Sequence, residues 1–117
     1  MIIDETSVKE GGFTTRWLIG PWNSQSSLDF GITFLHPDQQ VKPHLHERVE
    51  EIFYLIEGQI SLILDRDQKE ITLKPGMAAH IPPKTIHALH NGSSTTAKLV
   101  CVKSPSLPSD KKYLAIG

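Results

Sequence analysis

The sequence contains a single cysteine, Cys101, so one chain can form neither an internal disulfide nor a cluster of thiolate ligands. Aromatic residues are scarce, at 7%, and no apolar run is long enough to cross a membrane as a helix. Neither sign of charge dominates, because 12 basic and 13 acidic residues leave a net charge of −1. We therefore expect no membrane and no nucleic acid among the partners.

The N-terminus also lacks the basic and apolar regions of a secretory signal. Together with the free thiol, this predicts a reducing, cytoplasmic location. Cys101 itself lies within residues 98–103, an apolar run that predicts a strand, where the thiol packs as a small buried side chain.

A chain of 117 residues with 38% hydrophobic residues suits one domain with one core. We therefore treat residues 1–117 as a single domain, with a barrel core over about 13–103. Residues 104–117 are polar and rich in proline, which predicts an extended C-terminal segment whose Tyr113, Leu114 and Ile116 dock back on the barrel.

The pattern of short apolar segments between turn residues predicts an all-β fold, a sandwich or a barrel. Glu57-Gly58 and residues 65–68 predict hairpin connections that make three successive strands antiparallel neighbours in one sheet. The expected strands cover residues 13–19, 28–35, 44–47, 51–56, 59–64, 69–73, 77–81, 86–90 and 95–103.

The residues that indicate chemistry begin with His44 and His46, which point to the same face if they lie on a strand. Glu51 follows beyond a bend and can supply a carboxylate oxygen, with Glu50 as its nearby competitor. His87, after a proline-rich turn, can add a ligand from a different strand. Three imidazoles and one carboxylate suit one divalent iron, manganese, nickel, copper or zinc ion better than magnesium or calcium.

Two stretches of the chain resemble the motifs of the cupin superfamily. Pro43-His44-x-His46-x4-Glu51-x6-Gly58 is similar to the first cupin motif, and Gly76-x5-Pro82-x4-His87-x3-Asn91 is similar to the second. The resemblance implies a double-stranded β-helix, a jelly-roll-like cupin barrel, that holds a mononuclear metal ion. The residues it implies as metal ligands are His44, His46, Glu51 and His87.

The chain departs from the two motifs at two turns. Asp38 and Lys84 stand where the motifs usually have glycine, so we expect altered turn geometry without loss of a ligand. Lys84 and Arg48 also lie beside the turns that carry ligands, where a cation either stays solvated or attracts an acidic substrate.

Two further residues are candidates for a substrate pocket. If Glu51 points inward, strand alternation also sends Phe53 inward, where it either lines a pocket or packs in the core. His80 is either a pocket acid or base, or a hydrogen-bonded histidine of the core or an interface. Glu51 is also a candidate base in addition to its role as ligand.

The opposite face of the strand that contains Glu51 carries Ile52, Tyr54 and Ile56. Three large apolar side chains are too many for a solvated surface, so this face should pack on a second sheet or a second subunit. We predict a homodimer.

Three functions remain open. The first is a metal-dependent dioxygenase that acts on a small oxygen-bearing organic substrate. The second is a metal-dependent isomerase, epimerase or lyase of a sugar or uronate, in which the ion is only a Lewis acid. The third is a cupin that binds a small molecule without catalysis. We rank the dioxygenase first, because a three-histidine site for an open-shell ion suits oxygen chemistry.

Overall fold

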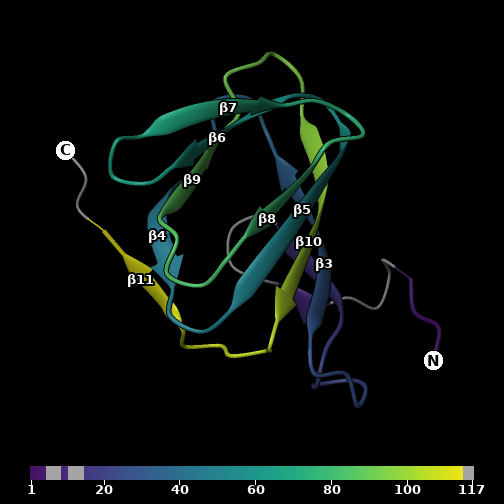
Figure 1. The fold of residues 1–117 in the computed structure, drawn as a ribbon. Helices are drawn as coiled ribbons and strands as arrows, with labels where there is room; N and C mark the ends of the chain where they lie inside the picture. Colours follow the sequence, from purple (N-terminus) through teal and green to yellow (C-terminus); the bar gives the residue numbers. More distant parts are fainter. Residues whose placement is uncertain (5–8, 11–14, 115–117) are drawn as a thin grey trace.

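The computed structural model describes residues 1–4, 9–10 and 15–114. These residues form an all-β structure, as expected, and no helix occurs among them (Figure 1). The described part of the chain accordingly contains no helix long and apolar enough to span a membrane. The strands are β1 (Lys9–Glu10), β2 (Thr15–Ile19), β3 (Asp29–Leu35), β4 (Gln40–His46), β5 (Glu50–Glu57), β6 (Ile60–Leu64), β7 (Lys69–Leu73), β8 (Ala78–Ile81), β9 (His87–His90), β10 (Ala97–Ser104) and β11 (Lys111–Tyr113).

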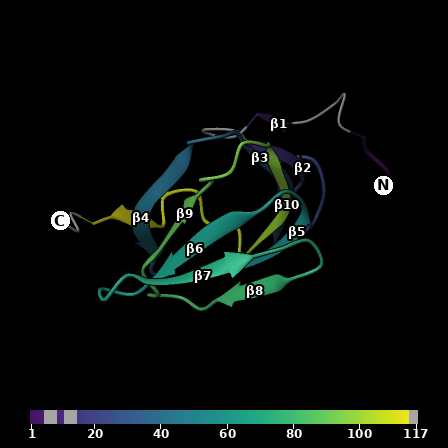
Figure 2. The ribbon, with the colours of Figure 1, turned by 90° about the horizontal axis from the view of Figure 1, so that it is seen from above.

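The strands form two sheets that face each other across the core (Figure 2). One sheet has six strands in the order β1-β2-β3-β10-β5-β8, and the other has five in the order β11-β4-β9-β6-β7. Strand alternation fills the space between them with apolar side chains. The buried core consists of Leu35, Phe53, Leu55, Ile60, Leu62, Leu73, Ile81, Leu89, Ala97, Leu99 and Cys101.

One of the two predicted hairpins is present and the other is not. β6 pairs antiparallel with β7 through the turn over residues 65–68, as predicted. β5 and β6, however, lie in different sheets, because β5 pairs with β8 and β10 whereas β6 pairs with β9. Gly58, at φ 85°, carries the chain from one sheet to the other. A Cβ at Gly58 would lie 2.7 Å from the Cα of Ala97, so only glycine fits this close crossing.

β4 begins earlier than the predicted strand over residues 44–47, because Pro43 does not interrupt it. The pairing of β4 with β9 is irregular between Val41 and His44, and this irregularity accommodates a residue that has no N–H to donate. On the other edge of β4, the carbonyl of Pro43 accepts a hydrogen bond from the backbone N–H of Leu114. The proline thus lies next to the ligand-bearing half of the strand.

The two positions where glycine is replaced keep a left-handed backbone. Asp38 has φ 66° and Lys84 has φ 67°, a region that favours glycine. Both residues thus adopt a backbone conformation that is strained for a side chain with a Cβ. The Lys84 turn is held by a 2.6 Å hydrogen bond from its backbone N–H to the carbonyl of His46.

Replacing Lys84 by glycine should therefore stabilise the protein. Glycine removes the strain of the left-handed conformation, but it also makes the unfolded chain more flexible, which favours unfolding. The first effect on the free energy of unfolding is the larger one, so we expect about 0.5–1 kcal/mol of added stability. The measurement is the midpoint of urea unfolding. Lys74→Gly is the control, because Lys74 is not among the residues with positive φ and glycine should lower stability there. An unchanged or lower midpoint for Lys84→Gly would contradict the strain argument.

The outer face of β5 is apolar, as expected. Ile52, Tyr54 and Ile56 are 41%, 44% and 39% exposed, and Met77 next to them is 41% exposed. The same face continues over β10 and β3, where Val100 and Ile32 are cross-strand partners. No second sheet of the described chain covers this face.

We propose that a second copy of the chain covers this outer face. Glu50 and Glu57 are exposed at the ends of β5, whereas Arg16 and Lys98 lie over the ring of Phe34 on the same sheet, so one face carries both signs of charge. Two copies related by a twofold axis can pair these charges around the apolar strip. Light scattering at micromolar concentration should give a dimer, and Ile52→Lys should give a monomer. Thr72→Lys, an exposed position in the other sheet, is the control, and a monomeric wild type would refute the proposal.

Candidate metal centre

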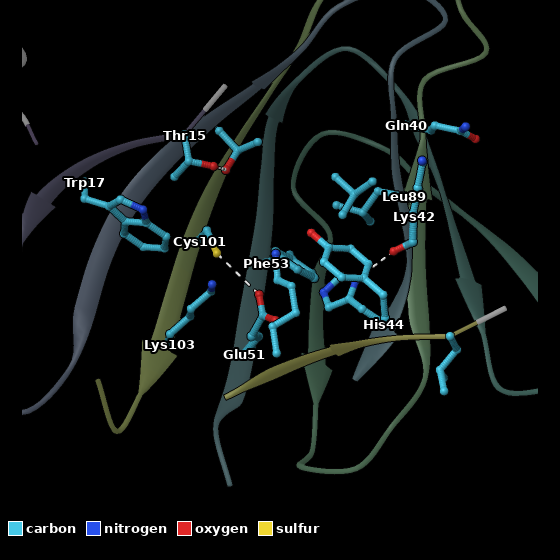
Figure 3. Close-up of a pocket in the computed structure, with 15 residues that line it drawn as sticks. Thr15, Trp17, Gln40, Lys42, His44, Glu51, Phe53, Leu89, Cys101 and Lys103 are labelled. Carbon is cyan, nitrogen blue, oxygen red and sulfur yellow. Dashed lines mark hydrogen bonds between the residues drawn. The ribbon is translucent and has the colours of Figure 1, made fainter. Parts of the chain in front are cut away.

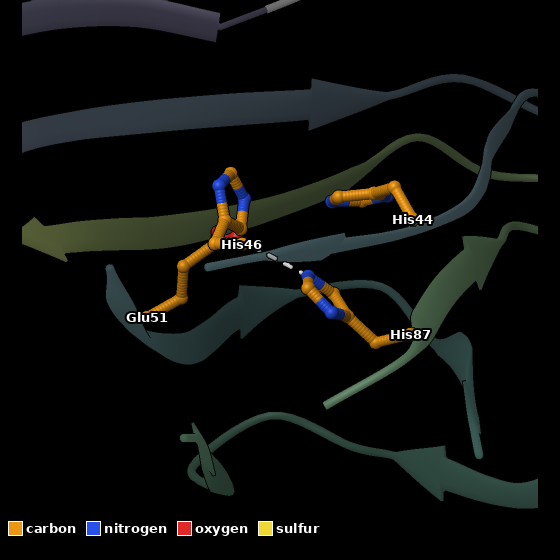
Figure 4. Close-up of side chains that lie close together, drawn as sticks. All are labelled: His44, His46, Glu51 and His87. Carbon is orange, nitrogen blue, oxygen red and sulfur yellow. Dashed lines mark hydrogen bonds and ion pairs between the residues drawn. The ribbon is translucent and has the colours of Figure 1, made fainter. Parts of the chain in front are cut away.

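The four predicted ligands come together between the two sheets (Figure 4). His44 and His46 are alternate residues of β4 and share its inner face, and the pairing of β4 with β9 places His44 opposite His87. Glu51 projects from β5 in the facing sheet. All four side chains are buried, and one ligand atom from each lies within 4.8 Å of the others.

Backbone carbonyls orient two of the imidazoles. Nδ1–H of His44 donates to the carbonyl of Lys42 over 2.7 Å, and Nδ1–H of His87 donates to the carbonyl of Thr85 over 2.9 Å. With the proton on Nδ1, each ring presents the lone pair of Nε2 to the centre. Burial, and then repulsion by the His87 ring whenever that ring is protonated, lower the pKa of His44 to about 3, so His44 is neutral at neutral pH and able to bind a metal.

Glu51 faces these nitrogen atoms as a carboxylate. Burial by itself would raise the pKa of Glu51, but contacts with His46 and His87 outweigh it and lower the pKa below its usual range. Such a carboxylate is a poor base, so the fold favours Glu51 as a ligand over its alternative role in proton transfer. Its Oε1 lies 3.2 Å from Nε2 of His87 and 2.5 Å from Nε2 of His46.

The short contact between His46 and Glu51 does not have the direction of a hydrogen bond. Within the described chain, both ring nitrogens of His46 are buried without a hydrogen-bond partner. Buried polar atoms of this kind are costly unless something else satisfies them. Nε2 of His87 hydrogen-bonds to Oε1 of Glu51 at 3.2 Å, whereas His46 has no such bond, and a divalent cation between these atoms would satisfy all of them, so the residues fit one. Iron, manganese, nickel, copper and zinc all accept such mixed nitrogen and oxygen ligands.

A cavity of about 650 Å³ opens beside the centre (Figure 3). His44 and Glu51 form part of its wall, and Phe53 lines it as the alternation of β5 predicts. On the far side, the hydroxyls of Thr15 and Thr33 hydrogen-bond to each other at 2.8 Å. The cavity thus gives a small molecule direct access to two of the four ligands.

The sequence of the central strands matches a known family. A profile of the Cupin domain matches residues 31–103 of the chain. The chain belongs to the cupin family. The polyketide cyclase RemF from Streptomyces resistomycificus has the same fold, with a TM-score of 0.84 and 23% identity over 100% of this chain and 87% of that one. A Klebsiella pneumoniae protein with a double-stranded β-helix domain superposes with a TM-score of 0.75 and 16% identity, over 94% of this chain and 92% of that one. The expected double-stranded β-helix is therefore confirmed.

Two curated relatives of this cupin have closer sequences over shorter stretches. Quercetin 2,3-dioxygenase of Bacillus subtilis is 38% identical over 68 residues, which are 58% of this chain and 19% of the relative. Polyketide synthase CurC of Streptomyces cyaneus is 28% identical over 105 residues, or 89% of this chain and 66% of the relative. The chain thus spans less than two thirds of the length of each.

His80 lies outside the cavity of this cupin. Alternation in β8 sends Ala79 and Ile81 toward the core and His80 outward, opposite Ile52 on the exposed face. Its ring lies 3.4 Å from the carboxylate of Glu50, and its side chain is 56% exposed. The pocket position predicted for His80 is therefore not found, and its alternative as a histidine of an interface fits the structure.

Sequence reasoning missed several residues that line the cavity. These are Lys42, Lys103 and Lys111, which come from β4, β10 and β11. Alternation in β10 provides one usable signal, since an inward Cys101 implies an inward Lys103. No comparable signal marks β11, which lies in the polar segment after the predicted barrel core.

Cys101 is buried, as predicted, and it also contacts the metal centre. Its thiol donates to Oε2 of Glu51 over 3.6 Å, the oxygen that does not approach the histidines. Burial and then the nearby Glu51 carboxylate raise the pKa of Cys101 well above its usual value, so the group remains a thiol and a donor. Cys101 thereby fixes the orientation of the Glu51 carboxylate in this cupin.

Replacing Cys101 by valine should weaken zinc binding about tenfold, because partners of metal ligands typically contribute 10–100-fold in affinity. Cys101→Ser keeps a donor at the same position and should retain affinity close to that of the wild type. Competition with a chromogenic chelator measures both constants. Equal affinities for the serine and valine variants would show that the thiol only fills space.

Proposed function

We propose that this cupin is a metal-dependent dioxygenase that acts on a small enolic or phenolic substrate. The observation that carries the proposal is the convergence of four buried ligand atoms at the wall of a cavity. His44 and Glu51 belong both to the ligand set and to the cavity wall. A substrate oxygen in the cavity can therefore reach the centre from the side that the protein leaves open.

A divalent transition ion supplies a Lewis acid at this position and, if it is redox-active, a means of reacting with dioxygen. The residues of the chain prepare that chemistry. Lys42 and Thr85 hold two imidazoles in the tautomer that binds metal, and Phe53 and Leu89 provide apolar walls that exclude water from the substrate. The 38% identity to quercetin 2,3-dioxygenase over 68 residues supports this assignment.

A second candidate is a non-oxidative reaction, such as an isomerisation or a lyase step, with the ion acting only as a Lewis acid. CurC, a polyketide synthase by name, is similar to 89% of this chain, whereas the dioxygenase is similar to 58% of it. Lys103 and Tyr113 line the cavity and can exchange protons with an enolisable carbon. This alternative needs no oxygen.

Oxygen consumption distinguishes the two candidates. Protein purified without a metal-affinity tag is analysed for metals, stripped, and reloaded separately with iron, manganese, nickel, copper or zinc. The dioxygenase should consume oxygen with a flavonol or 1,3-diketone when loaded with a redox-active ion, and should not with zinc. Turnover of the same substrates by the zinc protein without oxygen uptake would favour the second candidate. Oxygen uptake that persists in His44→Ala would contradict both.

A further inference from the structure

The charges around the cavity are strongly unequal. Lys42, Lys103 and Lys111 line the cavity, whereas Glu51 is the only acidic residue among the described lining residues, and it is already engaged with histidines. The protein as a whole carries a net charge of −1, so this positive charge is a local feature. A concave site lined by one sign of charge concentrates ligands of the opposite sign.

Two of these lysines flank the metal centre on opposite sides. Lys103 is the cross-strand partner of Glu51 in the six-stranded sheet, and Lys111 is the partner of His46 in the five-stranded sheet. Cross-strand partners point to the same face of a sheet, so both lysines face inward with the ligands. Lys103 projects between Trp17 and Glu51 in Figure 3.

Each of these two ammonium groups lies over an aromatic ring. Nζ of Lys103 lies 5.2 Å from the centre of the Trp17 ring, and Nζ of Lys111 lies 5.5 Å from that of Tyr113. Neither lysine takes part in an ion pair among the described residues. A cation–π contact orients an ammonium group without neutralising its charge. The charge therefore remains available to a ligand.

The apolar part of the wall is aromatic at three places. Trp17 and Tyr113 stand beside the lysines, and Phe53 lies deeper, with its ring centre 6.2 Å from that of His87. Flat side chains of this kind stack well on a conjugated ring system. Positive charge next to aromatic surface favours an anion with a planar body over a sugar phosphate, which offers no flat apolar face.

We infer that the cavity binds a planar, conjugated organic anion whose carboxylate or enolate is paired with Lys103 and Lys111. The ring system of this ligand packs against Trp17 and Tyr113. The inference deepens the proposed function, on which it rests for the placement of the substrate beside the metal centre, and it names the substrate class as an aromatic or polyenolic acid.

The test compares two probes of the same shape, 1-hydroxy-2-naphthoate and its neutral carboxamide, by titration calorimetry. The naphthoate should bind the wild-type protein at least about tenfold more tightly than the amide, the preference expected from a hydrogen bond to a charged group. Lys103→Met should remove most of this preference. Lys98→Met is the matched control, because Lys98 lies on β10 and faces outward over Phe34, and it should leave the preference unchanged.

A bound metal also attracts a carboxylate, so every titration is made with zinc-loaded and with metal-free protein. The loss caused by Lys103→Met should appear in both states. If that variant does not fold, Lys111→Met replaces it, with the adjacent Lys112→Met as control, since Lys112 faces outward and pairs with Glu47. Equal affinities for acid and amide in the wild type, or equal losses in the inward and outward variants, would overturn the inference.

The outcome is separate from that of the oxygen assay. If the zinc-loaded protein prefers the acid but no metal supports oxygen uptake, the substrate class is supported and only the dioxygenase proposal fails. Oxygen uptake without any preference for the acid refutes the substrate class and leaves the dioxygenase in place.

Discussion

Replacing His44 or His87 by alanine is expected to abolish tight metal binding, whereas replacing His90 by alanine should leave it intact. Each of the first two residues contributes one of four converging ligand atoms. Loss of a residue that only hydrogen-bonds to a ligand typically lowers metal affinity by 10–100-fold. Loss of a ligand itself should therefore lower the affinity by more than about 100-fold. Metal content after gel filtration and zinc competition with a chelator both report the effect.

His90 is the matched control because it lies on the same short strand as His87. An odd spacing of three residues puts its ring on the opposite face of β9, where it is only half-buried and pairs across the sheet with Gln40. If all three alanine variants lost zinc equally, the inward and outward assignment of β9 would be wrong. If none lost it, the four residues would form a polar pocket and not a metal centre.

The convergence of His44, His46, Glu51 and His87 was predictable because its signals are local. His44 and His46 alternate along one strand, and Glu51 and His87 follow at spacings that match the two cupin motifs. Strand alternation then determined that Phe53 faces inward and Tyr54 outward without knowledge of the sheet order. These inferences needed only the alternation of side chains between the two faces, which holds in any β-strand.

Two of the errors concern which strands pair. β5 and β6 were expected to be neighbours, but the close packing of Gly58 on Ala97 directs the chain into the other sheet. The orientation of His80 depends on its pairing with Ile52, and nothing in residues 77–81 alone distinguishes the two faces. Pairing between distant strands is set by tertiary contacts, which a single sequence does not reveal.

The same limit explains why sequence reasoning did not find two of the lysines of the cavity. Arg48 and Lys84 lie next to the ligand turns in the chain, and both are exposed. The cavity takes its lysines instead from β4, β10 and β11, and two of them, Lys103 and Lys111, lie far in sequence from the two histidines of β4. Two of them meet the site only because β10 lies beside β5 and β11 lies beside β4.

The segment over residues 105–114, here called the C-terminal strap, holds the strand that bears two ligands. The backbone of β11 pairs with β4, so Lys111 lies opposite His46 and Tyr113 opposite His44. Tyr113 and Leu114 line the cavity, as the expected docking of this segment implies, whereas Ile116 is outside the described residues. The strap therefore lies directly against the strand that carries His44 and His46.

Asp110 anchors the strap to the turn between β4 and β5. Its Oδ2 accepts hydrogen bonds from the backbone N–H groups of Arg48 at 3.0 Å and Val49 at 2.9 Å. Partial desolvation acts to raise the pKa of Asp110, but these two hydrogen bonds lower it below its ordinary value. A carboxyl group with a lowered pKa stabilises the fold above its unfolded pKa, and this contribution is lost as the pH falls through the folded value.

Asp110→Ala should accordingly speed the dissociation of zinc, although it changes none of the four predicted ligands. Two backbone donors lose their acceptor, which costs about 1 kcal/mol because water can partly replace the carboxylate at this half-exposed position. We expect zinc to dissociate about tenfold faster as β4 loses its support from the strap.

Stopped-flow transfer of zinc to a chelator at neutral pH gives the rate. Ser109→Ala, an exposed neighbour in the same strap, should behave as the wild type. A dissociation rate in Asp110→Ala equal to that of Ser109→Ala would mean that β4 holds its histidines through the sheet alone.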